Sequence, residues 1–494
     1  EQSRAFIKIT KTKVLAAAAQ IQDILFAANK FPIGIEPSPV PEGVAEMVHF
    51  DPKAPEGKTP SSTVVRPDIL KALGPLKDQL EPIKDKLKEG PGKTPTSQTF
   101  EPALEAAKGM EKLIHDQLIE SDASKSIRSF VFEMSLFGHG IMKGPFALDK
   151  EYPKWNDQGQ YEPVMKTLPE VHFVSIWDAY PDPDARNMEE CEHFIHRQRL
   201  SKTRMRALKK RPLFRHESID LAIAAGTNYT KEYWENDLED YETHDSIDRY
   251  EVFEYWGILD KDIAEQTGIE IPRHLKDRDQ LQVNIWMCND YILRFVLNPF
   301  MPARIPFNAC PYEMNPYSFF GVGVAENMDD TQYAMNGFFR LAIDNAAKSA
   351  NVMLEIDDNM LVAGQSLDLY PGKVFRRNGG QPGQAVHAIT IPNVTDQCLQ
   401  MFDKARQLAD EATGMPSYAH GQAGVTGVGR TASGMSMLMG AAKENIKAVV
   451  RNIDDYLLVP LGKSMFAFNM QFNFDPKYVG DLEVVARGTE SLMR

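Results

Sequence analysis

Apolar residues recur at helical spacing in three long stretches of the last third of the chain. The first runs from Asn327 to Ser349, and its apolar positions fall at three- and four-residue steps: Met328, Met335, Phe339, Ala342 and Ala346. The second begins after Thr395 as a predicted N-cap and ends at Gly414 and Pro416, with an apolar stripe formed by Leu399, Phe402, Ala405, Leu408 and Ala412. The third extends from about Gly434 to Val459, with a seam formed by Met435, Met439, Ala442, Ile446, Val449, Ile453 and Tyr456. Short strands and glycine turns are predicted between the first two helices, over 351–393.

The first two thirds of the chain mix helical and strand patterns. Runs rich in valine, isoleucine and aromatic residues predict strands at 171–177, 192–199, 249–259 and 281–288. Helices are predicted at 14–29, at about 68–88, twice within 101–137, and over the basic segment SKTRMRALKK, which Ser201 caps. The prolines from Pro32 to Pro60 predict an extended arm between the first two helices. The fold class that follows is α+β.

Composition and charge limit the classes of function. The 494 residues carry a net charge of −14, so any contact with DNA should be local and basic within a repelling surface. The four cysteines contain no CxxC pair, which favours a reducing compartment and argues against structural zinc. No apolar stretch is long enough to predict a membrane span. The sequence starts without methionine and stops in the polar stretch GTESLMR, so we expect further residues beyond its ends.

The stretch GVTGVGRT, residues Gly424 to Thr431, fits the phosphate-loop pattern GxxxxGK[ST] at every position except Arg430. Arginine is a poor substitute for the lysine because its planar, forked group is bulkier. A helix end and a polar loop precede the motif, whereas a phosphate loop follows a buried strand. What remains is a glycine-rich loop containing Gly421, Gly424, Gly427 and Gly429, with a helix predicted on each side.

Basic residues form one stripe on the helix after this loop. Lys443, Lys447 and Arg451 are spaced at i, i+4 and i+8, and Arg430 in the loop extends the stripe. On a single helix such a stripe is more often a solvated face than a binding surface. Its position beside a glycine-rich loop in an acidic chain makes it a candidate contact for DNA.

Other candidate sites have simpler interpretations. His193 and His196 are three residues apart on a predicted strand and therefore point to opposite faces, which disfavours a shared metal ion. Asp182 and Asp184 in YPDPDAR fit a capped turn better than a calcium loop. The Gly321-Val-Gly323 pair fits the start of a helix. We find no catalytic set of side chains, so the sequence predicts no enzyme, no metal and no cofactor.

Three stretches together resemble the portal (head-to-tail connector) proteins of tailed bacteriophages, particularly the short-tailed, podovirus-like type. They are SLFGHGIMKGPF at 135–146, WDAYPDPDARNMEECEHFIHRQRLSKTRMRAL at 177–208, and PYEMNPYSFFGVGVAENMDDTQYAMNGFFRLAIDNAAKSANVMLEID at 311–357. Their order and spacing extend the resemblance over most of 120–470.

The resemblance implies an arrangement of the chain in a portal-type, ring-forming fold. Paired stem helices would be 323–349 and 395–414, with a small clip at 350–394 between them. A tunnel loop would be 415–433, followed by a tunnel helix and a return to the wing at 434–470. The wing would be 1–322, and the C-terminal crown would start within 471–494. Lys373, Arg376 and Arg377 in the clip would meet a partner or lie as a solvated strand end.

The function implied is a ring at one vertex of the capsid, with twelve copies as the resemblance implies. Double-stranded DNA would pass through the ring, and the terminase large subunit and then adaptor or tail proteins would dock on it. Capsid and scaffolding proteins would be further partners, and the protein, made in the host cytoplasm, would end in the virion. A sparsely basic channel agrees physically, since tight binding to phosphates would have to be broken at every step. The alternatives are an ATP-driven nucleic-acid motor using Gly424 to Thr431 and a viral scaffold protein that conducts nothing.

Overall fold

The structure, a computed structural model, describes the chain in segments. They are residues 3–26, 31–38, 102–155, 159–229, 248–269, 271–351, 353–415, 445–473, 475 and 482–488. The chain divides into two compact units, each built from segments that are distant in sequence. The first unit comprises Glu1–Gln20, Ser135–Gly138 and Val322–Ile446, and the second comprises Ile21–Met134, His139–Gly321 and Lys447–Arg494.

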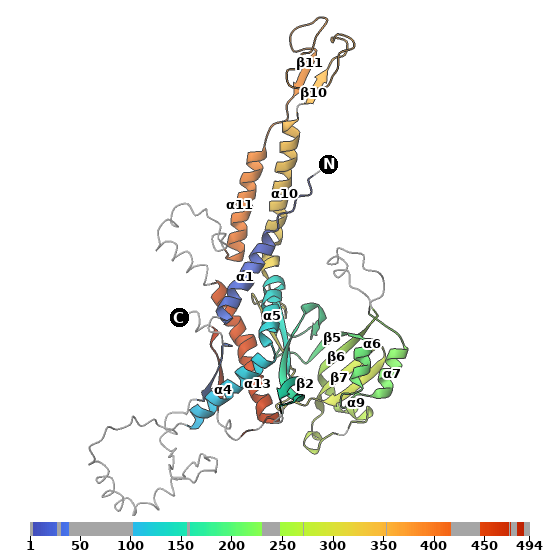
Figure 1. The fold of residues 1–494 in the computed structure, drawn as a ribbon, viewed down its shortest axis with the longest axis vertical. Helices are drawn as coiled ribbons and strands as arrows, with labels where there is room; N and C mark the ends of the chain where they lie inside the picture. The colour runs from blue at the N-terminus through green and yellow to red at the C-terminus, as the bar shows by residue number, and fades with distance from the viewer. Residues whose placement is uncertain are drawn as a thin grey trace, which may run out of the picture. The chain divides into compact units, whose positions relative to one another are not determined.

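Two long helices form the centre of the first unit. α10 (Val324–Ala350) and α11 (Thr395–Thr413) lie side by side, and the chain between them forms the small antiparallel pair β10 (Met353–Ile356) and β11 (Val386–Ile389) (Figure 1). α10 begins at Gly323, where a side chain would be impossible, because a Cβ atom would lie 2.4 Å from the backbone nitrogen of Gly138. α11 ends at Gly414, whose φ of +60° lies in the left-handed region that glycine adopts without strain.

A five-stranded antiparallel sheet is the largest sheet of the second unit. Its strand order is β4-β5-β6-β7-β8. The short helices α6 (Lys202–Leu208), α7 (His216–Ala224) and α9 (Lys261–Gln266) pack beside it (Figure 1). The strands are β4 (Ala179–Pro181), β5 (His193–Ser201), β6 (Arg249–Asp260), β7 (Gln280–Cys288) and β8 (Tyr291–Leu297).

A second sheet has the order β3-β2-β9 and contains a long hairpin. The hairpin strands are β2 (His139–Trp155) and β3 (Tyr161–Val174), and β9 (Phe307–Pro311) pairs with the first residues of β2. The beginning of β2 is buried, whereas the part of the hairpin near its turn is largely exposed on both faces. Alternation of apolar and polar residues is therefore weak there, which is why the sequence predicted only the end of β3.

Helices and one small strand pair complete the second unit. α4 (Pro102–Glu120), α5 (Ala123–Phe137) and α13 (Val459–Phe472) supply the helical part, while β1 (Ile33–Pro37) pairs with β12 (Leu482–Ala486). Buried Gln117 on α4 and Asn469 on α13 exchange two amide hydrogen bonds of 2.7 and 2.9 Å. Such a reciprocal pair satisfies both amides inside the protein and fixes the register of the two helices.

One buried ion pair links the two sheets. Lys143 on β2 donates to Glu254 on β6 over 2.5 Å, and the Glu254 carboxylate also accepts from Gln198 and from the indole of Trp256, over 2.6 and 2.8 Å. Burial pushes the pKa of Glu254 upward, but Lys143 and His196 together hold it below its ordinary value. Around this pair lies an apolar core that includes Phe194, Trp256, Phe300 and Phe307.

The predicted elements are confirmed where the structure describes them, with several changes. The mixed helix and strand content confirms the α+β class, and the helices within 101–137 are α4 and α5. The helix predicted at 14–29 is α1, which spans Ile9–Phe26. Ser201 caps α6 as predicted, since its hydroxyl accepts from the backbone N–H of Arg204. The helix predicted at about 68–88 lies outside the described residues.

Replacing Lys143 by methionine should destabilise the second unit. The substitution keeps most of the side-chain volume but removes the cation from a buried carboxylate, which costs about 3–5 kcal/mol. The loss should shrink between pH 8 and pH 5, because without Lys143 burial raises the pKa of Glu254 and protonation then removes the uncompensated charge. Thermal unfolding of both proteins across this pH range measures the effect.

Lys166→Met is the matched control, because Lys166 makes an ion pair with Glu120 in which both side chains are about a third exposed or more. That substitution should change the unfolding free energy by about 1 kcal/mol or less. Equal losses for both variants, or a loss at position 143 that does not depend on pH, would show that Lys143 acts through packing alone.

Candidate nucleic-acid and assembly surfaces

The glycine-rich loop lies outside the described residues. The same holds for its candidate residues Gly421, Gly424, Gly427, Gly429 and Arg430, and for Lys443 at the beginning of the next helix. The predictions for these six residues therefore remain predictions.

The helix after the loop is described from residue 445 and continues to Phe472. The sequence predicted its end near Val459, which is wrong, because the helix continues through Pro460. A π-helical turn at Asp454–Leu458 precedes the proline, and the N–H of Val459 bonds to the carbonyl of Asp454. The wider π-helical turn makes room for the pyrrolidine ring of Pro460, which would clash with the preceding turn of a regular α-helix.

Two members of the predicted basic stripe are described. Lys447 is half-buried and Arg451 is exposed, and Ile446, Val449 and Ile453 of the predicted seam are buried. The seam is thus confirmed at these three positions, and Arg451 is accessible to a ligand. Neither basic side chain forms an ion pair within the described part of the chain.

Contacts between α10 and α11 explain how the second helix begins. The side chain of Asn345 on α10 accepts from the backbone N–H of Val394 over 2.8 Å and donates to the carbonyl of Pro392 over 3.1 Å. The predicted N-cap at Thr395 is wrong, because Val394 occupies that position and the neighbouring helix satisfies its N–H. The hydroxyl of Thr395 instead donates to Asn345 over 3.3 Å.

The apolar stripe predicted on α11 is only partly covered. Ala405 and Ala409 are buried, and the rings of Phe339 and Phe402 pack with centroids 5.9 Å apart. Leu408 is 52% exposed, and Met401, outside the predicted stripe, is 55% exposed. On α10, Tyr333 and Leu341 are 73% and 57% exposed. Four large apolar side chains on one helical pair therefore contact solvent in the single chain.

A ladder of polar side chains on α10 holds the N-terminal segment. Residues Gln332, Asn336, Arg340 and Asp344 follow one another at four-residue steps, so they lie along one face of the helix. The amide oxygens of Gln332 and Asn336 accept from Thr10 and Ile7, and Arg340 donates to the carbonyl of Ala5 over 2.8 Å. Asp344 accepts from the backbone of Ser3 over 2.8 Å. Apart from the hydroxyl of Thr10, which also donates to Gln332 over 2.9 Å, these bonds reach backbone atoms, so they depend little on the side chains of the segment.

Lys13 on α1 fixes the same segment to the end of α11. Its ammonium group is buried and donates to Asp410 over 2.7 Å, to Thr413 over 3.0 Å and to the carbonyl of Met415 over 2.6 Å. Burial lowers the pKa of Lys13, and Asp410 opposes that change. The sequence assigned residues 1–322 to the wing, whereas residues 3–20 lie in the unit that contains α10 and α11. No signal in the sequence indicated this contact, because Lys13 precedes the helix predicted at 14–29.

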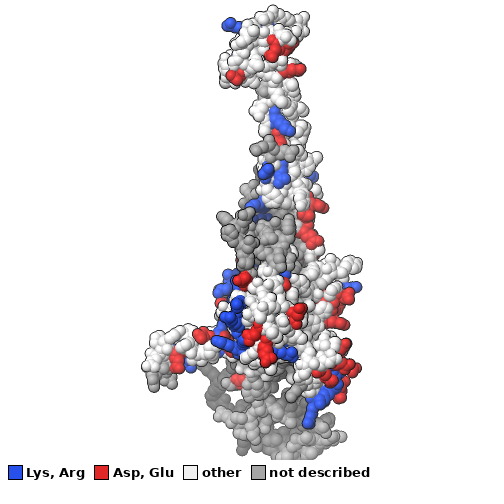
Figure 2. Space-filling model, turned by 90° about the vertical axis from the view of Figure 1, so that its right-hand side faces the viewer, with Lys and Arg blue, Asp and Glu red and all other residues white. Residues whose placement is uncertain are grey.

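The basic residues of the β10–β11 segment are held by carbonyl groups and aromatic rings. Lys373 and Arg377 donate to the carbonyls of Ser366 and Gly380, and the Lys373 ammonium lies 5.1 Å from the ring centre of Tyr370. Arg376 is exposed, and its backbone bonds to the side chain of Gln365 and to the N–H of Val362. Figure 2 shows that uncharged residues form most of the visible surface around β10 and β11.

The two histidines of β5 have separate surroundings. His193 stacks on Tyr255, while His196 lies 3.4 Å from the Glu254 carboxylate, and burial lowers the pKa of His196. Asp182 caps its own turn by accepting from the N–H groups of Asp184 and Glu192, as the sequence predicted. Within the described ranges, no three His, Cys, Asp or Glu side chains converge as metal ligands would. None of the described helices has the length and apolar character that crossing a membrane requires.

A family model described as phage SU10 portal protein matches residues 133–482. The chain belongs to this family of bacteriophage portal proteins. A search of curated proteins finds no match. The portal family match includes all of β2, α10 and α11, and it favours the portal hypothesis over a nucleotide-driven motor or a non-conducting scaffold.

The portal family match begins after α1, β1 and α4, so the docked N-terminal segment of this chain lies before the matched residues. The three stretches that suggested a portal, 135–146, 177–208 and 311–357, all lie within it. The family is one of structural proteins, in which binding and assembly surfaces carry the function.

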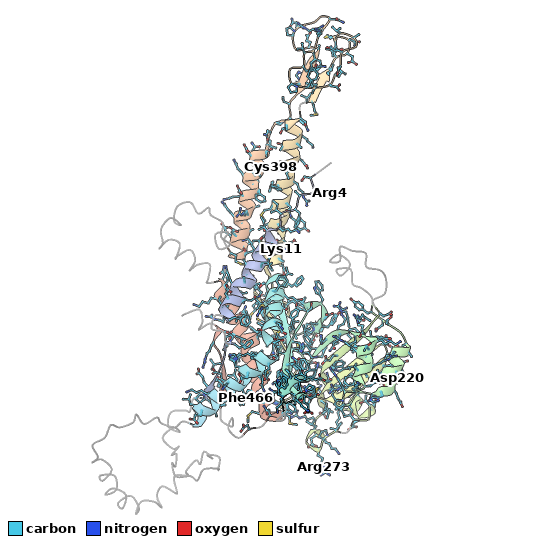
Figure 3. All side chains as sticks on the ribbon, viewed as in Figure 1. Arg4, Lys11, Asp220, Arg273, Cys398 and Phe466 are labelled. Atoms are coloured by element: carbon cyan, nitrogen blue, oxygen red, sulfur yellow. The ribbon has the colours of Figure 1, made fainter. Side chains whose placement is uncertain are left out.

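Replacing Lys13 by methionine should release the N-terminal helix of this portal protein from α11. The substitution removes three hydrogen bonds of a buried ammonium, and we expect local opening to become easier by about 2–3 kcal/mol. Amide hydrogen exchange over residues 9–20 should then be faster by about thirty-fold or more. The exposed Lys11, labelled in Figure 3, provides the control variant Lys11→Met, which should exchange like the unmodified protein. Unchanged protection from hydrogen exchange in Lys13→Met would mean that the polar side chains of α10 alone hold the segment.

Proposed function

We propose that this portal protein assembles into a closed ring whose central channel conducts double-stranded DNA into and out of the capsid. The ring would occupy one capsid vertex of a short-tailed phage and contain twelve copies. It would receive the terminase large subunit during packaging and adaptor or tail proteins afterwards. Contacts with capsid and scaffolding proteins would hold it in the virion.

The family match supports assigning the parts of the chain to a portal ring. We assign α10 and α11 to the stem and residues 350–394 to the clip. Residues 415–433 would be the tunnel loop and 434–470 the tunnel helix, with the crown starting in 471–494. The wing would comprise the region up to residue 322 without residues 3–20, which pack on the stem helices.

The observation that carries the ring is the exposed apolar surface of α10 and α11. Tyr333, Leu341, Met401 and Leu408 are all more than half exposed, although they lie on helices whose other faces are packed. Several large apolar side chains exposed on one pair of helices favour a contact with another molecule. If a second copy covers one helix and offers its other face to a third copy, the contact is heterologous. Such a contact forms a closed ring when the rotation from one copy to the next completes a full turn.

The charge distribution supports a channel that does not hold DNA tightly. The chain carries a net charge of −14, and Lys443, Lys447, Arg451 and Arg430 would be the basic positions facing the duplex. Each phosphate that a protein neutralises adds salt-dependent affinity, which would oppose sliding. Lys373, Arg376 and Arg377 in the clip would contact an acidic surface of the terminase or an adaptor.

Charged residues on the exposed stem surface should prevent ring formation. In Met401→Glu/Leu408→Glu, assembly would bury two carboxylates in an apolar contact, at a cost of several kcal/mol for each subunit interface. Sedimentation velocity should show a monomer where the unmodified protein sediments as a ring. Leu221→Glu, at a 51% exposed leucine of α7, is the control and should leave the ring intact. A ring formed by the double variant would refute the assignment of this surface to subunit contacts.

Reversing the basic stripe should affect DNA and not assembly. The variant Lys443→Glu/Lys447→Glu/Arg451→Glu should form rings by negative-stain microscopy, because none of these residues belongs to the apolar stem surface. Packaging or retention of DNA should fall, because the reversed charges repel phosphates along the path. Packaging at the normal level would place the stripe against a neighbouring subunit or solvent.

A further inference from the structure

A large cleft opens within the second unit, between the β2–β3 hairpin, the five-stranded sheet and the helices α4 and α13. Its volume is about 1310 Å³. Buried aromatic side chains form part of its lining: Trp256, Trp286 and Phe300. The cleft is therefore large enough for several side chains of a partner and is lined partly by apolar rings.

Most charged groups of the cleft are paired with one another. Lys143 pairs with Glu254, Lys166 with Glu120, and both Arg197 and Arg199 with Asp178. Three further lining residues have no carboxylate within ion-pair distance among the described residues: Arg204, Arg211 and Arg294. The cleft thus holds three guanidinium groups that form no ion pair with the described part of the chain.

Arg294 is the deepest of the three. It is half-buried on β8, its guanidinium lies 5.4 Å from the ring centre of Phe214, and its Nε atom is buried without a hydrogen-bond partner among the described residues. Burial lowers the pKa of Arg294, the Glu254 carboxylate opposes that change, and the nearby Arg211 adds to it. Arg211 and Arg294 both line the cleft and repel each other, so an anion bound near both would be stabilised by each of them.

Trp286 supplies a second, independent observation. It is 6% exposed, lines the cleft, and its indole N–H has no acceptor in the described part of the chain. Buried donors are almost always paired, so an acceptor from outside the chain would complete this site. Arg204 and Arg211 belong to the segment KTRMRALKKRPLFR at 202–215, which contains seven basic and no acidic residues. Figure 2 shows a patch of Lys and Arg side chains on the sheet-containing part of the molecule.

We propose that this cleft binds an acidic segment of a partner protein, whose carboxylates pair with Arg204, Arg211 and Arg294 and whose apolar or aromatic side chains contact the aromatic lining. Carboxylates match the forked donors of arginine in two parallel hydrogen bonds. A duplex fits the cleft poorly, because its phosphates lie on a wide convex surface and cannot reach a half-buried arginine. The proposal does not depend on ring formation.

A peptide with this composition is available from the chain itself. The stretch EYWENDLEDYE at residues 232–242 combines six carboxylate side chains with three aromatic ones. As a fluorescent probe it should bind the full-length protein, with an affinity that falls as salt is raised. The counterpart QYWQNNLQNYQ, which has the same aromatic residues and no carboxylates, should not bind. The titration is repeated on a full-length variant carrying these neutral residues at 232–242, so that no copy on the protein competes with the probe.

Arg294→Gln and, separately, Arg211→Gln should weaken binding of the probe by about ten-fold or more, because each removes a charge-assisted contact. Arg206→Gln is the matched control, since Arg206 is exposed on the same helix as Arg204 but does not line the cleft, and it should change affinity by about two-fold or less. Arg211 is exposed, so its variant remains informative if Arg294→Gln does not fold.

Three results would overturn the proposal. They are no binding of the peptide to either protein background, equal losses in Arg206→Gln and Arg211→Gln, and preferential binding of a 20-base-pair duplex that depends on the same cleft arginines. The last result would assign the cleft to nucleic acid.

Discussion

The buried ion pair between Lys143 and Glu254 is the interaction on which the second unit depends. It joins a strand of the three-stranded sheet to a strand of the five-stranded sheet. The Glu254 carboxylate also accepts hydrogen bonds from Gln198 and Trp256. A buried charge is costly unless it is fully paired, so this cluster tolerates few arrangements of the two sheets. Lys143 and Glu254 also line the cleft, so its shape depends on where this pair holds the hairpin.

The first unit is held by a different kind of contact. Side chains of α10 bond to backbone atoms of residues 3–10, and Lys13 closes the arrangement at the end of α11. These contacts occupy one face of the helical pair and leave Tyr333, Leu341, Met401 and Leu408 exposed. The polar face is thus satisfied within the chain, while these four apolar side chains are left without cover by the described residues. In the ring that we propose, the next copy of the chain would supply such a partner.

The order of the elements and the protein family could be predicted from the sequence. The periodic apolar positions predict the bounds of α10 and α11 to within a few residues. Each helix buries one face against a neighbour, so an apolar residue recurs on that face at every turn. Ser201 and Gly414 were identifiable as caps, since capping depends on the residue itself and on local backbone geometry. The resemblance over 135–146, 177–208 and 311–357 agrees with the family match.

Contacts between distant segments were decided by the tertiary structure alone. Three such contacts join residues that are far apart in the chain, and local spacing cannot predict them. They are the pairs Lys143–Glu254 and Lys13–Asp410, and the approach of Arg294 to the cleft that Arg204 and Arg211 also line. The exposed part of the hairpin was not predicted because it buries neither face. The helix was predicted to end before Pro460, because a π-helical turn that accommodates a proline leaves no local signal in the sequence. Local sequence thus determined the helices and their caps, whereas long-range packing decided which charges are paired and which remain open to a ligand.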